Sequence, residues 1–165
     1  HLFNAMAPMT HREPGVIGAA LDNDEVGVEL ITDGVHVHPS AVRVAFRLFE
    51  NRIIMISDSM AATGLGDGTY FLGGQEVTVQ NGRATMHGGK TLAGSVCNLF
   101  GCMRRAVEMG VPFGQAVRSA STNPARAIGI EHDYGSLEPG KLANIILLDE
   151  DLNINTIILR GQIID

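Results

Sequence analysis

The chain has 165 residues, with 12 basic and 18 acidic side chains and a formal net charge of −6 at pH 7. This negative charge argues against nucleic-acid binding and against binding to an anionic membrane surface. No window approaches the roughly 20 apolar residues of a membrane span, and we expect no signal peptide, so the composition indicates a globular protein with a real core.

The first third of the sequence predicts strands that alternate with a helix. Residues 1–6, "HLFNAM", are short and apolar and predict the end of a strand. Residues 25–39 predict a strand of β-branched residues that ends in a glycine turn with two histidines. Residues 39–50 predict a helix, because Pro39 suits a first helical position and apolar residues recur at helical spacing. The run "RIIMISD", 52–58, predicts a strand buried on both faces in a parallel sheet.

The middle of the sequence changes from long apolar runs to short strands joined by turns. A β-hairpin is expected around residues 70–86, because Asn81-Gly82 is a strong hairpin signal. A loop then leads to Ser95, which we expect to cap a helix over residues 96–110.

The end of the sequence returns to strands. After a second helix over residues 112–121, strands are expected over 143–149 and 155–165, on either side of an acidic turn. Strands that alternate with helices predict an α/β fold with a parallel sheet. The closing pair of strands differs from this pattern and predicts a separate small β domain.

The first residue and the cysteines bear on the kind of protein to which the chain belongs. The sequence starts at His1 without methionine and is apolar at once, which we interpret as the later part of a longer polypeptide. Cys97 and Cys102 are its only cysteines. A single C-x4-C spacing on a predicted helix is a poor zinc signature, so we interpret them as reduced thiols of a cytoplasmic protein.

Candidate site residues lie where the predicted strands end. Asp58 closes a buried strand with no basic neighbour, so it needs water, a partner from elsewhere or a function. The carboxyl ends of parallel strands meet at the active site of α/β folds, so His1, His36 and Asp58 are expected at one rim. Alternatively, Asp58 caps a turn and His1 is an exposed terminus. His36 and His38 alternate along an extended segment, so at most one of them faces a site.

Two loops offer contacts to a ligand. In "HREPG", Arg12 can bind a phosphate or carboxylate through its planar guanidinium, or it can form a surface ion pair with Glu13. In "TLAGS", residues 91–95, a turn of small residues either offers backbone N–H groups to a ligand or is a plain loop. The spacing alone does not decide between these alternatives.

Six segments together resemble the N-acetylglucosamine-6-phosphate deacetylases of the amidohydrolase superfamily. They occur in that family's order over nearly the whole chain, and they read "HLFNAMAPMTHREPG", "ELITDGVHVHP", "IIMISDSMAATGL", "GKTLAGS", "STNPARAIGI" and "GSLEPGKLANIILLD". The specificity of the match rests on the first segment and on "DGVHVHP", whereas "NPARAIG" and "EPGKLAN" are typical of amidohydrolases more broadly.

The resemblance implies a particular α/β fold. Residues 1–140 would form the later part of a (β/α)8 TIM-type barrel, and residues 141–165 would supply strands of a small β-sandwich. The family's earlier barrel strands are missing from this sequence, together with a glutamate and a histidine that ligate the metal.

The activity implied by the resemblance is metal-dependent hydrolysis of the acetamide of N-acetylglucosamine 6-phosphate to glucosamine 6-phosphate and acetate. His1 is then a metal ligand, with zinc as the first choice and iron or another divalent ion as alternatives. Asp58 is the implied catalytic acid and base, which takes a proton from the attacking water and passes it to the leaving amine. Because the chain holds one ligand of the metal set, we expect it to be inactive by itself.

The other implied positions concern the phosphorylated amino sugar. Asn4, Ala5 and Arg12 match phosphate-binding positions of the family. His36 matches a histidine that contacts the substrate and helps to hold the tetrahedral intermediate. A homodimer is implied, because the equivalents of Arg12 and His36 reach the neighbouring subunit's site. The loop near the acetamido group contains Leu92, Ala93, Gly94 and Ser95.

Two other interpretations stay open. One is a different amidohydrolase, such as a cyclic-amide hydrolase or a deaminase, whose reaction requires no phosphate clamp in "HREPG". The other is a structural piece that assembles through exposed strand edges.

Overall fold

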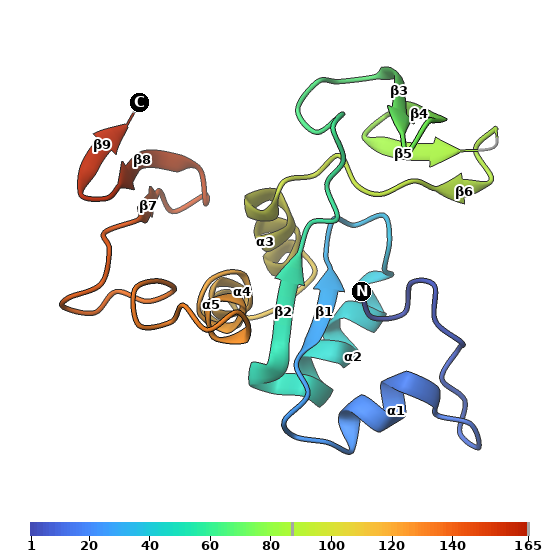
Figure 1. Ribbon diagram of the computed structural model, residues 1–165, viewed down its shortest axis with the longest axis horizontal. Coiled ribbons are helices and arrows are strands. Elements are labelled where there is room, and N and C mark those ends of the chain that lie inside the picture. The colour runs from blue at the N-terminus through green and yellow to red at the C-terminus, as the bar shows by residue number, and fades with distance from the viewer. Residues whose placement is uncertain (87, 165) are drawn as a thin grey trace.

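The computed structural model describes residues 1–86 and 88–164 (Figure 1). Its first part contains α1 (Gly15–Leu21), β1 (Val28–Ile31), α2 (Pro39–Phe49), the 3-10 turn η1 (Glu50–Arg52) and β2 (Ile53–Ile56). Its second part contains β3 (Gly68–Leu72), β4 (Gln75–Gln80), β5 (Arg83–Met86), β6 (Thr91–Leu92), α3 (Leu99–Glu108), α4 (Phe113–Ala120), α5 (Thr122–Ala127), β7 (Ile145–Leu148), β8 (Ile154–Leu159) and β9 (Gln162–Ile164). Asp165, the last residue of the strand expected over 155–165, lies outside the described residues.

β1 and β2 form a parallel pair, in register from Val28 opposite Ile53 to Ile31 opposite Ile56. Figure 1 shows both arrows pointing the same way, with α2 next to β1 and with α4 and α5 beyond β2. The side chains of Leu30, Ile31 and Ile53 are fully buried, as expected of parallel strands that helices cover. The predicted parallel pairing is confirmed, and it puts the carboxyl ends of both strands at the same edge.

α2 joins the two strands over the segment that predicts a helix. It begins at Pro39 and ends at Phe49, one residue before the predicted end. His38 caps it, because the ring Nδ1 accepts the N–H of Ser40 at 3.2 Å. Glu50 ends it by turning to φ +42°, outside the helical region. The buried residues of α2 are Val42, Ala45, Phe46 and Phe49.

Residues 1–6 do not form the predicted strand. Leu2 is buried and donates its N–H to the carbonyl of Glu29 at 2.7 Å, as a strand beside β1 would. Phe3 and Ala5 then take φ values of +72° and +50°, in the left-handed region that strands exclude. The strand prediction was wrong because an apolar run indicates burial but does not determine the backbone conformation. Leu2 is buried as expected, and the residues after it leave the extended conformation.

β3, β4, β5 and β6 form an antiparallel sheet in that order, in the upper part of Figure 1. β4 and β5 meet at Asn81-Gly82, whose φ values of +51° and +72° are those of a type I′ turn. The hairpin predicted around residues 70–86 is confirmed. Val77, Val79 and Ala84 are buried and form a small core under this sheet.

α3 begins later than predicted because Asn98, and not Ser95, caps it. The Oδ1 atom of Asn98 accepts the N–H of Gly101 at 2.8 Å. The hydroxyl of Ser95 accepts the N–H of Cys97 at 2.9 Å in the extended segment before the helix. Serine and asparagine are both favoured caps, so the sequence pattern alone does not choose between them.

The second predicted helix is α4, and α5 follows it directly along β2. Asn123 of α5 is buried and donates its side-chain N–H to the carbonyl of Ile53 at 2.7 Å. This hydrogen bond ties α5 to the start of β2. Ala116 and Ala125 are also buried, and such small side chains let the helices lie close to their neighbours.

β7, β8 and β9 form a separate antiparallel sheet, which lies beyond α4 and α5 in Figure 1. β8 and β9 meet at Arg160-Gly161, with φ values of +50° and +79°. All residues of these three strands are at least partly exposed, although most are isoleucine or leucine. The domain boundary that we expect near residue 140 stays a prediction.

Residues 1–86 and 88–164 therefore form a mixed α/β structure with two parallel strands, and they do not close a barrel. The order β1, α2, β2 confirms the predicted α/β class. Within these ranges, no helix has the length and apolar character needed to cross a membrane.

Candidate active site

The carboxyl edge of β1 and β2 brings together one histidine and two aspartates. Asp33 and His36 lie in the loop after β1, and Asp58 lies two residues after β2. The Nδ1 atom of His36 is 2.8 Å from Oδ2 of Asp33. The opposite ring nitrogen, Nε2, is 3.9 Å from Oδ2 of Asp58. His36 therefore lies between two carboxylates that come from different strands.

Asp33 fixes the loop that carries His36. Its Oδ1 atom accepts the N–H groups of Val35 and His36 at 2.9 and 3.0 Å, while its Oδ2 atom binds the ring. Such a turn, in which an aspartate binds the backbone two and three residues on, is a common use of this side chain. The side chains of Asp33 and His36 are 4% and 6% exposed, whereas that of Asp58 is 40% exposed. The inner pair is buried and held by hydrogen bonds, and the exposed outer carboxylate can meet a ligand.

The electrostatics of this group follow from these contacts. Burial by itself raises the pKa of Asp33, but the hydrogen bonds from the ring of His36 and from the N–H groups of His36 and Val35 lower it to about 2. The hydrogen bond to Asp33 raises the pKa of His36 against the opposing effect of burial, and the negative charges of Asp33 and Asp58 act in the same direction. The pair therefore favours a carboxylate beside a protonated imidazole.

The backbone of Asp58 is held by the segment that follows β6. Asp58 has φ +49°, and its carbonyl accepts the N–H of Ser95 at 2.8 Å. Met60 then donates its N–H to the carbonyl of Ser95 at 2.9 Å, which forms a short parallel bridge. Gly94 has φ +77°, and a Cβ atom there would lie 3.1 Å from the carbonyl oxygen of Asp58. Glycine is therefore required for the close approach of this loop to Asp58.

The "TLAGS" loop thus lies against Asp58, as a ligand-binding loop would. The side chains of Ala93 and Ser95 are nonetheless buried. Ala93 donates its N–H to the carbonyl of Ala84 at 3.1 Å, and the Ser95 hydroxyl binds the N–H of Cys97. Leu92 ends β6 and is half-buried. The predicted contacts of this loop with an acetamido group stay a prediction.

No hydrogen bond or ion pair of the described residues joins the amino-terminal candidates to these three residues. His1 is exposed, and its terminal amine is 3.7 Å from Oε2 of Glu29. Among residues 1–86 and 88–164, no cluster of three or more His, Cys, Asp or Glu could hold a metal ion. The assignment of His1 as a metal ligand therefore stays a prediction.

The phosphate-binding candidates form a separate loop. Asn4 donates its side-chain N–H to the carbonyl of Leu2 at 3.1 Å, and Ala5 is exposed with φ +50°. Arg12 is exposed at the tip of a turn that Thr10 and Glu13 close with hydrogen bonds. Within the described part of the chain no ion pair joins Arg12 to Glu13 and no hydrogen bond joins this loop to Asp58. The role of these residues stays a prediction.

Asp33 is the functional candidate that the sequence interpretation missed. The signal was an aspartate three residues before the histidine in "DGVH", a spacing that lets one carboxylate bind both the loop backbone and the ring. His38, the other histidine of the segment, is exposed and caps α2. Of the two histidines, His36 lies beside Asp33 and Asp58, and the expectation that at most one of them faces a site stays a prediction.

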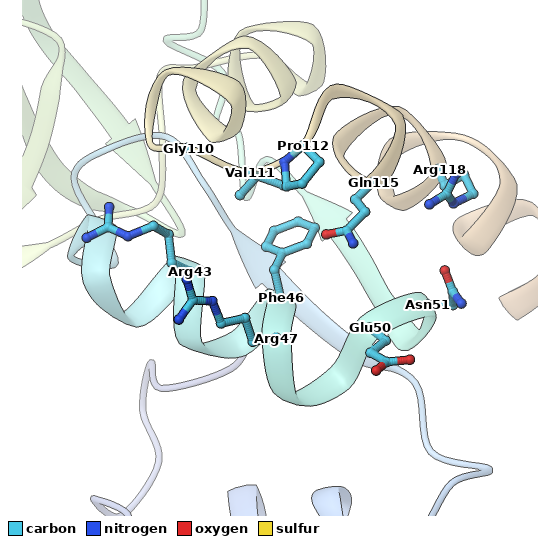
Figure 2. A pocket seen from close by; sticks show the side chains of 10 residues that line it. All are labelled: Arg43, Phe46, Arg47, Glu50, Asn51, Gly110, Val111, Pro112, Gln115 and Arg118. Carbon is cyan, nitrogen blue, oxygen red and sulfur yellow. The ribbon is translucent and has the colours of Figure 1, made fainter.

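The side chains of Figure 2 line a different cavity, of about 490 Å³, between α2 and α4. It lies at the amino end of β2, because Glu50 and Asn51 directly precede that strand, whereas Asp58 follows it. Phe46 points into its centre, with Arg47 and Arg118 at opposite sides. This cavity contains none of the predicted site residues and is not the candidate active site.

Amidohydrolases are similar to this chain along most of its length. The profile of the amidohydrolase family matches residues 19–164. A protein of Escherichia coli K12, named provisionally as an N-acetylgalactosamine-6-phosphate deacetylase, is 41% identical over 165 residues, or 99% of this chain and 98% of that protein. The N-acetylglucosamine-6-phosphate deacetylase of Bacillus subtilis strain 168 is 42% identical over 165 residues, which are 99% of this chain and 41% of that enzyme.

The fold is similar to that of a solved enzyme. The N-acetyl-D-glucosamine-6-phosphate deacetylase of Mycobacterium smegmatis, a mutant in complex with N-acetyl-D-glucosamine-6-phosphate, superimposes with a TM-score of 0.92 at 40% identity. The match covers 99% of this chain and 44% of that one. This chain therefore spans less than half the length of the longer relatives that it matches.

Proposed function

The chain belongs to the amidohydrolase family, in its N-acetylglucosamine-6-phosphate deacetylase branch, and we propose that the full-length protein deacetylates N-acetylglucosamine 6-phosphate. The predicted resemblance to this family is confirmed by the match over residues 19–164 and by the relatives of that name. The observation that carries the proposed activity is the approach of His36 to Asp58, 3.9 Å apart at the carboxyl edge of parallel strands. A carboxylate and an imidazole at such an edge can perform general acid–base hydrolysis.

The proposal includes a finer description of the fold. β1 and β2 would be the last two strands of a TIM-type barrel formed in part by residues 1–140. β7, β8 and β9 would belong to a small β-sandwich to which residues 141–165 contribute. The TM-score of 0.92 to a longer deacetylase supports this description.

A divalent metal ion is part of the proposed enzyme, with zinc ahead of iron or another metal. A catalytic zinc site has three protein ligands, and the described residues contain no cluster of that size. The described residues therefore supply only a part of such a zinc site. His1 is exposed and can contribute one imidazole, and the other ligands would come from the part of the longer relatives that this chain does not span. When bound, the ion would polarise the acetamide carbonyl.

Asp58 is the proposed acid and base of the reaction. Its carboxylate would accept a proton from the attacking water and give it to the amine as the C–N bond breaks, which releases acetate and glucosamine 6-phosphate. The exposed side chain leaves room for both water and substrate. The protonated ring of His36 would donate a hydrogen bond from Nε2 to the oxygen of the tetrahedral intermediate, while its Nδ1–H is donated to Asp33.

The proposed substrate contacts come from two loops. Asn4, Ala5 and Arg12 would bind the phosphate, and the loop from Leu92 to Ser95, through Ala93 and Gly94, would lie near the acetamido group. Arg12 is exposed and has its guanidinium available for an anion. A homodimer in which Arg12 reaches the neighbouring site remains part of the proposal, whereas the distance of 3.9 Å between His36 and Asp58 of the same chain supports a role for His36 in its own site. Two free cysteines support a cytoplasmic enzyme.

The proposed function is tested by acetate release from N-acetylglucosamine 6-phosphate. The purified full-length protein should release acetate after addition of zinc and should lose this activity when a chelator removes the metal. The 165-residue chain alone should show no turnover, because residues 1–86 and 88–164 contain no cluster of three possible metal ligands. Full activity in the presence of the chelator would contradict the proposal.

The phosphate assignment has its own test. Arg12→Ala should lower kcat/KM for N-acetylglucosamine 6-phosphate by about 10-fold or more, because a charge-assisted pair contributes on the order of 1.5–3 kcal/mol. Unphosphorylated N-acetylglucosamine should lose much less. An equal loss for both sugars would remove Arg12 from the phosphate site.

A second candidate substrate is N-acetylgalactosamine 6-phosphate. Two Escherichia coli proteins that are 41% identical to this chain carry the galactosamine name, one of them provisionally. The two sugars differ at one hydroxyl, so the proposed chemistry at the acetamide applies to both. The ratio of kcat/KM for the two epimers decides between them.

A further inference from the structure

We propose that Asp33 is a positioning residue, which orients the His36 ring so that Nδ1 faces the interior and Nε2 faces Asp58. The inference rests on the proposed function for its consequence in catalysis. Its structural part, the orientation and the ring tautomer, stands on the geometry of the loop alone.

One carboxylate makes three hydrogen bonds to the loop that follows β1. The two backbone N–H groups at Oδ1 fix the path of residues 33–36, and the ring nitrogen at Oδ2 fixes the direction of the histidine. A carboxylate accepts hydrogen bonds and cannot donate them when ionised, so Nδ1 must carry a proton. In the neutral ring Nε2 is then the bare nitrogen, and in the protonated ring both nitrogens donate.

Burial makes this arrangement difficult to replace. The side chains of Asp33 and His36 are 4% and 6% exposed, so water cannot substitute for either partner. A buried carboxylate without hydrogen bonds is costly, and both oxygens of Asp33 have partners. The Asp33 carboxylate occupies the Nδ1 side of the ring. The other ring nitrogen, Nε2, faces the exposed Asp58 at 3.9 Å.

Other charged groups near the ring affect how the proposal is tested. His36 faces Asp33 on one side and Asp58 on the other. Cys97 also interacts electrostatically with Asp33, and a hydrogen bond with Cys102 lowers the pKa of Cys97 to about 7. The pKa of His36 should therefore also be measured in the Cys97→Ser variant. This control separates the effect of a Cys97 thiolate on the pKa of His36 from the effect of Asp33.

The first test is nitrogen NMR of the histidine rings in the 165-residue chain, with the His36 signals assigned by their loss in His36→Gln. We expect the neutral ring to carry its proton on Nδ1. Asp33→Asn keeps an oxygen for the two backbone N–H groups but directs an amide donor at Nδ1, so the proton should move to Nε2. The pKa of His36 should fall by about 1 unit or more in this variant. Asp24→Asn, at a side chain that is 97% exposed, is the matched control.

Two results would overturn the proposal. One is a neutral His36 ring protonated on Nε2 in the wild-type chain, a result that needs no variant and so does not depend on whether Asp33→Asn folds. The other is a folded Asp33→Asn chain with an unchanged tautomer and an unchanged pKa of His36.

The second test measures the catalytic consequence in the full-length enzyme. Asp33→Asn should lower kcat by about 100-fold with a smaller change in KM, and it should shift the pH–rate profile, because a neutral His36 ring stabilises the negative charge of the tetrahedral intermediate less than a protonated ring does. Loss of activity without a shift of the profile would reduce Asp33 to a structural role. If the tautomer result holds while the enzyme lacks deacetylase activity, the proposed function fails and the positioning role does not.

Discussion

The β1–β2 pair and the β7–β9 sheet are built from the same kinds of residue, but they differ in burial. Leu30, Ile31 and Ile53 are fully buried beneath α2 to α5. In the second sheet Ile146 is 48% exposed and Ile163 is 70% exposed. A cavity of about 690 Å³, lined mainly by apolar side chains, separates β7 from α3 and α4. Aliphatic composition therefore predicts a strand, while the covering elements decide how much that strand contributes to stability.

Core truncation should have its largest effect in the region of β1 and β2, compared with an exposed side chain outside it. Phe49→Ala, at a side chain that is 1% exposed beneath β2, should lower the free energy of unfolding by about 3–5 kcal/mol. Phe71→Ala, at a side chain that is 66% exposed in β3, is the matched control and should change it by less than about 0.5 kcal/mol. Urea unfolding followed by circular dichroism measures both. Equal losses would show that stability is not concentrated around β1 and β2.

Acid unfolding should also distinguish the two regions. The lowered pKa of Asp33, about 2 against an ordinary 3.8, corresponds to about 2 kcal/mol of stabilisation. The unfolded state binds the proton more readily, so this stabilisation is complete above pH 4 and is lost as the pH falls through about 2. Asp33→Asn should therefore lower the free energy of unfolding at neutral pH. It should also make that free energy fall less steeply as the pH is lowered, which we call the acid slope.

Asp149, in the turn between β7 and β8, is the control for that prediction. Hydrogen bonds from Asn153 lower the pKa of Asp149, but this carboxylate is exposed to solvent. Solvent screening should make the acid slope of Asp149→Asn close to that of the wild-type chain. A larger change for Asp149→Asn than for Asp33→Asn would contradict the account.

A buried hydrogen bond should have an intermediate effect. Asn123→Ala removes the donor to the Ile53 carbonyl and should cost roughly 1–2 kcal/mol, because that carbonyl is left without its partner in the core. Asn144→Ala removes an acceptor of the Arg160 N–H at 2.8 Å in an exposed loop beside the second sheet, where water can replace it. The difference in urea midpoint between these variants measures the contribution of burial to the two hydrogen bonds.

The smallest effect is expected in the second sheet itself. Ile163→Thr, in β9, should change the free energy of unfolding by less than about 0.5 kcal/mol. A loss above about 2 kcal/mol would mean that β9 is covered in solution. Sedimentation of the wild-type chain at several concentrations would then show whether a second copy covers it.

The elements with local signals could be predicted from the sequence. Pro39 and a helical pattern specify α2, and Asn81-Gly82 specifies the β4–β5 hairpin, because both signals act within a few residues. Two local predictions were wrong for physical reasons. Phe3 and Ala5 take left-handed backbones where an extended strand was expected, and Asn98 replaces the equally suitable Ser95 as a helix cap.

The candidate site could be predicted in part. The ends of two predicted parallel strands indicate that His36 and Asp58 lie at one rim, and the structure brings them to 3.9 Å. Asp33 could not be recognised, because its role depends on burial and on the direction of a ring that the sequence does not show. The metal site could not be predicted in full for a different reason, because His1 is a single candidate ligand and a metal site needs several ligands.

The most direct test of the central claim is turnover by Asp58→Asn in the full-length protein. Acetate release from N-acetylglucosamine 6-phosphate should fall by about 100-fold or more in kcat, with KM close to that of the wild-type enzyme, because a proton acceptor is lost while the substrate contacts remain. Asp24→Asn should keep wild-type kinetics. Turnover by Asp58→Asn within about threefold of the wild type would contradict the assignment of Asp58 as the catalytic acid and base.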